Sequence, residues 1–330
     1  MKIAILDDYQ DAVRGLDAFE LLDGHEVKVF THSPRGLGQL AIRLAPFDAL
    51  VLIRERTTFP AALLAKLPNL KLISQTGKVS GHIDVAAATA QGIAIAEGVG
   101  SPIAPAELTW TLIMAASRKI VPYASNLKDG LWQTASVNSA LNGVGRVLHG
   151  RTLGLWSYGK IGKLVAGYAR AFGMRVLVWG SEASRAAAVA DGVEAAPSRA
   201  ALFEQADVLS LHLRLADATR GIVTADDLAR MKPDALFVNT SRAELVAADA
   251  LEQALKQGRP GTAALDVFTS EPLAQDAPLL RIPTVLATPH LGYVEKDSYE
   301  IYFQAAFENI VTFAQGEPTN ILNPDALGKR

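Results

Sequence analysis

Residues 152–179, TLGLWSYGKIGKLVAGYARAFGMRVLVW, decide how the rest of the chain is interpreted. The first five, Thr152 to Trp156, form an apolar run suited to a strand buried on both faces of a parallel sheet. From Lys160 onward apolar residues recur at helical spacing, and Gly173 stands where such a helix should stop. Residues 176–179 are apolar again. The stretch is therefore a predicted strand, tight turn, helix and second strand.

The turn after the first strand carries a modified G-x-G-x-x-G pattern, with Ser157 in place of the first glycine. In this pattern Gly159 lets the backbone approach a pyrophosphate, and Gly162 lets the helix lie close to the strand. The amides of Lys160 and Ile161 face the anion, helped by the positive end of the helix dipole. The context of strand and helix indicates a dinucleotide-binding turn, the alternative being a glycine turn of another α/β domain.

Composition excludes several classes of function. The 330 residues include 32 Lys and Arg and 34 Asp and Glu, so neither a nucleic acid nor a membrane surface is an expected partner. There is no cysteine, which excludes disulfides, a thiolate nucleophile and a Cys-ligated metal, and we expect no metal site. The start MKIAILDDYQ does not resemble a signal peptide, and no apolar run reaches transmembrane length. We therefore expect a soluble, cytoplasmic protein.

Strands and helices alternate in two series. In the first series, predicted strands lie at 2–6, 26–30, 48–53, 71–74 and 93–95, and helical segments at 13–22, 38–44, 61–67 and 85–91. In the second, predicted strands lie at 152–156, 176–179, 208–213, 235–239, 262–265 and 285–287. Such alternation is typical of α/β domains with parallel sheets. We predict two doubly wound parallel-sheet domains, one flavodoxin-like and one of Rossmann type.

The segments outside these series set the predicted domain boundaries. A long helical segment, 105–127, is followed by an irregular arm, 129–150, rich in Gly, Asn and Ser. Such arms usually pack on a partner or a neighbouring domain, and we expect a homodimer. A last helical segment, 295–315, is free to return to the first domain. The predicted domains are residues 1–100 with 294–330, and residues 101–293, with the active site in the cleft between them.

Four separated segments, GRTLGLWSYGKIG, VNTSRAELV, ALDVFTSEP and ATPHLGY, stand in the order and spacing of one known family. The chain resembles the D-isomer-specific 2-hydroxyacid dehydrogenases from the Arg54 region to the final helical segment. The resemblance implies reversible hydride transfer between a nicotinamide cofactor, NAD or NADP, and a small 2-oxo acid or D-2-hydroxy acid. It also implies that the first domain binds the substrate and that the second binds NAD(P).

The resemblance further implies three catalytic residues in the second domain. Arg242 matches the arginine that grips the 2-oxo group and the carboxylate of the substrate. His290 matches the general acid and base, and Glu271 matches the carboxylate paired with it. The chemistry supports these residue types, because reduction of a 2-oxo acid needs a proton donor and a positive group for the carboxylate. A carboxylate beside histidine favours the imidazolium, and arginine can make two parallel hydrogen bonds.

Binding residues are implied in both domains. In the first, Arg54 matches an arginine at the cleft edge, and the loop of Gly77, Lys78 and Val79 matches backbone amides that hold the substrate carboxylate. In the second, Asp266 matches the aspartate near the nicotinamide carboxamide. The full predicted cofactor set is Ser157, Gly159, Lys160, Ile161, Gly162, Gly180, Ser181, Arg185, Thr240, Asp266 and Gly292.

Each of these polar residues also has an ordinary structural interpretation. His290 could be a loop residue whose imidazole is hydrogen-bonded to the backbone, and Glu271 could be a solvent-exposed glutamate in a turn. Arg242 could form a surface ion pair, and Asp266 could cap a turn. For the whole protein, the alternative is a non-catalytic nicotinamide-sensing protein of the same fold. The intact set of Arg242, Glu271 and His290 argues against that alternative.

Three departures from the family pattern concern specificity for the substrate or the cofactor. Gln75 stands where an arginine is frequent, and Lys78 where valine is common, so 3-phosphoglycerate is compatible with the resemblance but not implied by it. The sequence does not name the 2-hydroxy acid.

After residues 176–179, Gly180 replaces the aspartate that binds the ribose and repels a 2′-phosphate. Ser181 and Arg185 offer donors to a phosphate, whereas Glu182 could take over the ribose contact. We therefore expect NADPH to be accepted, without NADH being excluded.

Overall fold

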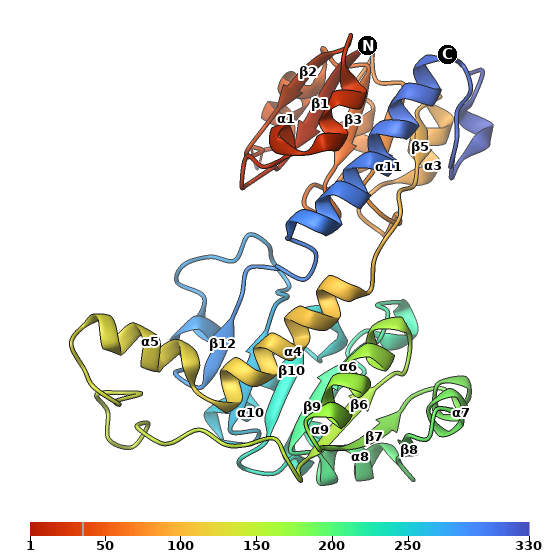
Figure 1. Cartoon of the computed structure of the whole chain (residues 1–330). Helices are drawn as coiled ribbons and strands as arrows, with labels where there is room; N and C mark the ends of the chain where they lie inside the picture. Colours follow the sequence, from red (N-terminus) through yellow and green to blue (C-terminus); the bar gives the residue numbers. More distant parts are fainter. Residues whose placement is uncertain (35, 330) are drawn as a thin grey trace. The chain divides into compact units, whose positions relative to one another are not determined.

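The computed structural model describes residues 1–34 and 36–329, which form two compact units (Figure 1). One unit comprises Met1–Ser101 and Val294–Arg330, and the other comprises Pro102–Tyr293. Each unit has its own parallel sheet and its own buried apolar side chains. The chain therefore enters the first unit twice, at its beginning and after the last strand of the second unit.

The first unit contains a five-stranded parallel sheet with the strand order β2-β1-β3-β4-β5. Its strands are β1 (Lys2–Leu6), β2 (Glu26–Val29), β3 (Ala49–Leu52), β4 (Leu72–Gln75) and β5 (Ala94–Ala96). This is the flavodoxin-like order, in which the direction of connection reverses between β1 and β3. All five predicted strands are present because each is a short, almost completely buried apolar run, apart from the half-exposed β2.

The helices of the first unit are α1 (Leu37–Leu44), α2 (Ala61–Leu64), α3 (Val85–Ala90) and α11 (Lys296–Ala314). The prediction of one helical segment at 13–22 is wrong. Two short 3-10 helices, η1 (Val13–Gly15) and η2 (Asp17–Leu22), occupy it, because Leu16 between them is extended. Helix α11 packs on this unit: Ser74 donates to its Ala306 carbonyl at 2.7 Å.

The second unit contains a seven-stranded parallel sheet with the order β12-β11-β10-β9-β6-β7-β8. Its strands are β6 (Thr152–Trp156), β7 (Arg175–Trp179), β8 (Glu194–Ala195), β9 (Val208–Leu211), β10 (Leu236–Asn239), β11 (Thr262–Leu265) and β12 (Val285–Ala287). Read along this unit, the order is that of a Rossmann fold with one added strand. The expected fold class is therefore confirmed. Strand β8 was not predicted, because two residues show no periodicity.

The helices of the second unit are α4 (Ile103–Ser117), α5 (Ile120–Lys128), α6 (Lys160–Ala171), α7 (Glu182–Ala190), α8 (Arg199–Gln205), α9 (Ala225–Arg230) and α10 (Ala250–Lys256). The single helix predicted at 105–127 is wrong, because Lys119 adopts a left-handed φ of 52° between α4 and α5. Helices α4 and α6 share one apolar cluster with the sheet, which includes Leu112 and Val165. A second cluster, around Phe203 and Phe237, includes residues of α8, α9 and α10.

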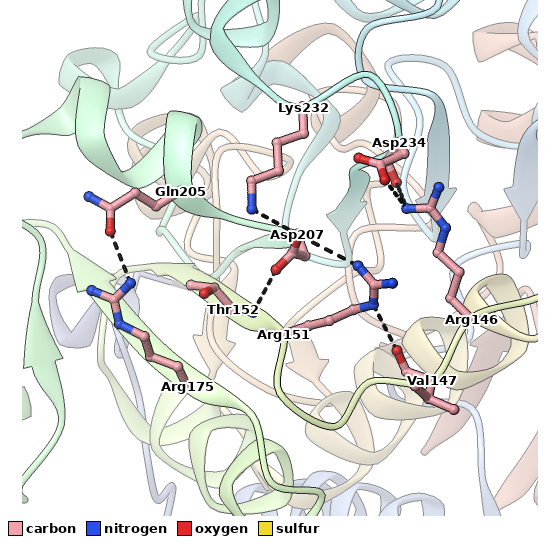
Figure 2. Close-up of polar contacts among 9 residues, drawn as sticks. All are labelled: Arg146, Val147, Arg151, Thr152, Arg175, Gln205, Asp207, Lys232 and Asp234. Atoms are coloured by element: carbon pink, nitrogen blue, oxygen red, sulfur yellow. Dashed lines mark hydrogen bonds and ion pairs between the residues drawn. The ribbon is translucent and has the colours of Figure 1, made fainter.

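Charged side chains tie together the amino ends of the second unit's strands (Figure 2). Asp207, directly before β9, accepts hydrogen bonds from the Thr152 amide at 2.8 Å and from the Lys232 ammonium at 2.9 Å. The Arg151 guanidinium lies 3.7 Å from the same carboxylate. Burial acts to raise the pKa of Asp207, but the bonds from Lys232 and Thr152 and the charges of Lys232 and Arg151 outweigh it. The pKa of Asp207 therefore lies below its ordinary value, and the carboxylate is ionised at neutral pH.

Candidate active site

The glycine turn lies between β6 and α6, at the carboxyl edge of the second unit's sheet. Ser157 adopts a φ of 87°, a conformation for which the pattern normally uses glycine. A Cβ added to Gly162 would lie 2.7 Å from the Ser157 carbonyl, so only glycine allows this close approach. A Cβ added to Gly159, the N-cap of α6, would meet no atom within 4 Å. The turn thus leaves open space beside the amino end of α6, where the amides of Lys160 and Ile161 begin the helix.

The end of β7 is packed against the first turn of α7. Gly180 has a φ of 154°, and a Cβ added there would lie 3.1 Å from the Ser184 hydroxyl oxygen. The same hydroxyl accepts a hydrogen bond from the Tyr158 amide at 2.6 Å, which ties α7 to the glycine turn. Ser181 caps α7 by accepting the Ser184 amide at 3.2 Å. Any side chain at position 180 would therefore be strained, which gives a physical reason for the missing aspartate.

His290 and Glu271 form a hydrogen-bonded pair. Nδ1 of His290, after β12, lies 2.6 Å from Oε2 of Glu271, after β11. The other carboxylate oxygen accepts the Phe268 amide at 2.8 Å. Burial acts to raise the pKa of Glu271, but the hydrogen bond and charge of His290, the Phe268 amide and the charge of Arg242 lower it overall. Glu271 is therefore ionised at neutral pH, and its contact with Nδ1 leaves Nε2 of His290 for proton exchange.

Asp266 holds the turn that carries His290. Its Oδ1 accepts the Thr288 hydroxyl and the Leu291 amide, both at 2.7 Å, and its Oδ2 accepts the Gly292 amide at 2.9 Å. The side chain is fully buried, and burial raises its pKa. His290 itself adopts a left-handed φ of 53° in this turn. The turn-cap interpretation of Asp266 is the one that these contacts support, and the Gly292 amide is likewise engaged within the turn.

Arg242 and Thr240 lie in the segment that follows β10. The Arg242 guanidinium donates to the Ser241 carbonyl at 2.7 Å, and its charge helps to lower the pKa of Glu271. The Thr240 hydroxyl is 2.7 Å from the Thr109 hydroxyl of α4. Three neighbouring strands, β10, β11 and β12, thus bring Arg242, Glu271 and His290 to one edge of the sheet.

Tyr293 is a neighbour of His290 that the sequence analysis missed. Its ring is buried, with 8% of its surface exposed, and meets the imidazole edge to face at 5.4 Å between centroids. The only signal was an aromatic residue three positions after the histidine in ATPHLGY. This ring packing restricts the orientation of the imidazole.

In the first unit, Arg54 lies beside the loop of Gly77, Lys78 and Val79. Arg54 follows β3 with a left-handed φ of 52°, and a Cβ added to Gly77 would collide with its guanidinium. The Gly77 amide donates to the Gln75 carbonyl at 2.8 Å. The structure therefore places Arg54 and Gly77 together, but it uses the Gly77 amide within the loop.

Glu97 engages the rest of this loop. It accepts the Val79 amide and the Lys78 ammonium, each at 2.8 Å. The Val79 amide is thus bonded to a carboxylate of the protein itself, and binding of a substrate carboxylate by the amides of this loop stays a prediction. The Lys78 side chain is 66% exposed and forms an ion pair with Glu97.

Among residues 1–34 and 36–329, no group of three or more His, Asp or Glu side chains is arranged to hold a metal ion. Across the same residues, none of the helices is both long and apolar enough to cross a membrane.

Comparison with known proteins gives consistent matches. The family model for the D-isomer specific 2-hydroxyacid dehydrogenase, NAD binding domain, matches residues 110–292. A glyoxylate reductase of Aeropyrum pernix is 34% identical over 320 residues, which cover 95% of this chain and 95% of the reductase. The crystal structure of a phosphoglycerate oxidoreductase from Vibrio cholerae o395 is 60% identical, with a TM-score of 0.92, over 96% of this chain and 99% of that one.

A second crystal structure, from Ralstonia solanacearum, is 58% identical, with a TM-score of 0.97, over 99% of this chain and 98% of that one. That protein is provisionally named a D-3-phosphoglycerate dehydrogenase oxidoreductase. All these relatives carry the names of enzymes, which favours the catalytic interpretation over a non-catalytic nicotinamide-sensing protein.

Proposed function

Because the chain belongs to the D-isomer-specific 2-hydroxyacid dehydrogenase family, we propose that it reduces a small 2-oxo acid to the D-2-hydroxy acid, with His290 as general acid. It is a nicotinamide-dependent oxidoreductase acting on CH–OH groups. The observation that carries the proposed role of His290 is its 2.6 Å contact with the ionised Glu271 at the carboxyl edge of the Rossmann sheet. The reverse oxidation uses the same residue as general base.

The proposed mechanism assigns one task to each of three side chains. Protonated His290 would give its proton from Nε2 to the carbonyl oxygen of the substrate. Glu271 stabilises the imidazolium before the transfer and keeps Nδ1 protonated afterwards. Arg242 would bind the substrate carboxylate and carbonyl oxygen through parallel hydrogen bonds, which fixes the orientation of the carbonyl group. In the oxidation direction the proton returns from the hydroxyl to Nε2.

The glycine turn fits the pyrophosphate of a dinucleotide. Gly159 leaves room for the phosphates, and the free amides at the start of α6, those of Lys160 and Ile161, would bind them. Ser157 and Gly162 shape the turn. When bound, the cofactor supplies the hydride, and Asp266 contributes by holding the His290 turn in place.

We expect NADPH to be accepted beside NADH. Gly180 provides no carboxylate to repel a 2′-phosphate, and the Arg185 guanidinium lies over the Trp179 ring at 4.6 Å, on the first turns of α7. The buried Nε of Arg185 has no hydrogen-bond partner within the described part of the chain. Ser181 and Glu182 lie on the same turn, and Glu182 favours the ribose of NADH instead. Steady-state kcat/KM for both cofactors decides this: an NADH preference above about a thousandfold, roughly 4 kcal/mol, would contradict it.

The activity itself is tested with a panel of 2-oxo acids, including glyoxylate, pyruvate and hydroxypyruvate. Each is mixed with NADH or NADPH and the purified protein, and the absorbance of the reduced nicotinamide is followed. We expect turnover of at least one acid and a product of D configuration by chiral chromatography. No turnover across the panel with either cofactor would contradict the proposed reaction.

We also propose which unit binds the substrate, which unit binds the cofactor, and how many copies of the chain associate. We assign Met1–Ser101 with Val294–Arg330 to substrate binding and Pro102–Tyr293 to cofactor binding, in a cytoplasmic homodimer. The dimer is supported by apolar side chains that are half exposed or more along α5 and the following arm, namely Ile120, Val121, Leu127, Trp132, Val137, Val144 and Val147. Sedimentation equilibrium tests it: a monomer at micromolar concentration would contradict the proposal.

A further inference from the structure

Glu97 is placed to control the charge of the loop proposed to bind the substrate. It follows β5, and its two carboxylate oxygens reach the loop after β4. Oε2 lies 2.8 Å from the Lys78 ammonium, and Oε1 accepts the Val79 amide at 2.8 Å. The Glu97 side chain is only 18% exposed, whereas that of Lys78 is 66% exposed. One largely buried carboxylate therefore takes up both an ammonium and an amide of this loop.

The backbone around Glu97 is fixed on both sides. Its amide donates to the Asn320 carbonyl at 2.9 Å, and its carbonyl accepts the Asn309 side-chain amide at 3.2 Å. The next amide, of Gly98, donates to the Gly77 carbonyl at 2.9 Å. A Cβ added to Gly98 would lie 2.7 Å from the Gly77 amide nitrogen, so the two loops are in close contact. Lys78 can rotate away from Glu97, but Glu97 has little freedom to leave the loop.

Further negative charge lies along the same edge of this sheet. Asp7 and Asp8 directly follow β1 and are buried, with 2% and 0% exposed. Arg56 faces this pair and donates to the Asp7 carbonyl at 2.6 Å. Arg54, against Gly77, is the cation nearest the loop backbone. In the strand order, β1 lies three positions from β5, about 14 Å at about 4.8 Å per strand, so Asp7 and Asp8 are farther from Glu97 than a Debye length of about 8 Å. Glu97 is therefore the carboxylate that acts on the loop directly.

We propose that Glu97 is a specificity-determining residue, which favours 2-oxo acids whose carboxylate is their sole anionic group and disfavours phosphorylated ones. The inference rests on the proposed function and narrows its substrate class. Within the first unit, Arg54 packs against Gly77 of the loop and is available to one carboxylate. A second anionic group near the loop meets a carboxylate, and Lys78, the cation that could receive it, is paired with that carboxylate. One relative is named for glyoxylate and another for phosphoglycerate, so the charge of Glu97 bears on a choice between a substrate without a phosphate and one with a phosphate.

The test uses two substrates that differ by one phosphate, hydroxypyruvate and its 3-phosphate ester. We measure kcat/KM for both with the full-length protein and its preferred cofactor. The wild type should use hydroxypyruvate at least about tenfold better, because like charges brought together in a binding site are strongly disfavoured. A preference for the phosphate ester would overturn the inference and leave the proposed function intact. Turnover of neither acid, nor of any other in the panel, would instead remove the proposed function.

The variant Glu97→Gln keeps the shape and one oxygen for the Val79 amide but removes the charge. Its ratio of kcat/KM values should move toward the phosphate ester by about tenfold, since Lys78 is then released from its ion pair. The matched control is Glu26→Gln, which also breaks a glutamate–lysine pair of this unit, with Lys2 at 3.5 Å, but at the amino end of β2. The control should leave the ratio unchanged. An equal ratio in wild type and Glu97→Gln would overturn the role of Glu97.

A measurement on the wild type alone covers the case in which Glu97→Gln does not fold, which its thermal unfolding would reveal. If discrimination is electrostatic, added KCl should shrink the ratio between the two substrates, because salt screens charges at a partly exposed site. A ratio that stays constant from low to high salt would show that shape, not charge, excludes the phosphate, and would overturn the inference.

Discussion

Each edge of the Rossmann sheet carries an ionised carboxylate held by charged partners, but the two carboxylates have different roles. At the amino edge, Asp207 is held by Lys232, Arg151 and a backbone amide (Figure 2). At the carboxyl edge, Glu271 is held by His290 and a backbone amide. Both carboxylates have pKa values below their ordinary range for the same reason, since favourable partners outweigh burial. The difference lies in the partners.

Lysine and arginine stay charged at every physiological pH, whereas a histidine can lose its proton near neutrality. The amino-edge network therefore contributes to stability at any pH at which Asp207 is ionised, whereas the carboxyl-edge pair can exchange a proton with a substrate. Ser157 and His290 adopt left-handed conformations at the carboxyl edge, and such strain is typical of functional sites. Variants at the two edges should accordingly separate activity from stability.

Among the first three variants considered, Arg242→Lys is expected to have the largest effect, and that effect is on kcat/KM. Lysine keeps the charge but cannot make two parallel hydrogen bonds, so kcat/KM should fall by roughly 1.5 to 3 kcal/mol, or about 10- to 150-fold. The control is Arg146→Lys at the amino edge, where Arg146 pairs with Asp234. It should leave kcat/KM unchanged. A fully active Arg242→Lys enzyme would show that the arginine does not bind the substrate through two bonds.

Asp207→Asn should show the opposite pattern. Loss of charged hydrogen bonds at a carboxylate that is 17% exposed should lower the free energy of unfolding by about 1 to 3 kcal/mol at pH 7, with kcat/KM retained. Because the folded pKa is depressed, this contribution is complete above the unfolded pKa and disappears as the pH falls through the folded pKa. The stability difference from wild type should therefore shrink below about pH 4. Urea unfolding at several pH values measures it, and a difference that persists in acid would contradict the ion-pair explanation.

Glu271→Gln should change the pH dependence of kcat/KM more than it changes the stability of the fold. Without the neighbouring carboxylate the imidazolium of His290 is less favoured, so the pH above which reduction fades should move to lower values. The acid side should be unaffected down to about pH 5, because the pKa of Glu271 lies below its ordinary value and the wild-type carboxylate stays ionised there. The profile of kcat/KM against pH is the measurement. Superimposable profiles for wild type and variant would mean that the two side chains are not coupled.

Much of this architecture could be predicted from the sequence. The strands were found because buried parallel strands are short apolar runs, and β6, β11 and β12 lie at the predicted residues. The catalytic residues were predicted from the family resemblance, and their positions after β10, β11 and β12 agree with it, because ligands bind at this edge in doubly wound sheets. The interruption at Lys119 could not be found, because its left-handed backbone depends on packing and carries no glycine signal.

Contacts between distant residues were the other part that the sequence could not provide. The interpretation of Asp266 as a cofactor contact missed its bonds to Thr288, Leu291 and Gly292, more than twenty positions away. Glu97 carried no motif at all, and its role depends on the contact between the loops after β4 and β5. A carboxylate's partners are set by the fold, whereas a pattern identifies only the residue type.

The most direct test of the catalytic edge is the variant His290→Asn, measured for turnover, NADH binding and thermal unfolding on the same preparation. We predict that kcat for reduction of the best 2-oxo acid falls by on the order of 10²- to 10⁴-fold, because the general acid is lost. The dissociation constant of NADH and the unfolding temperature should stay close to the wild-type values. A variant that retains near-wild-type kcat would contradict the assignment of His290 as the acid.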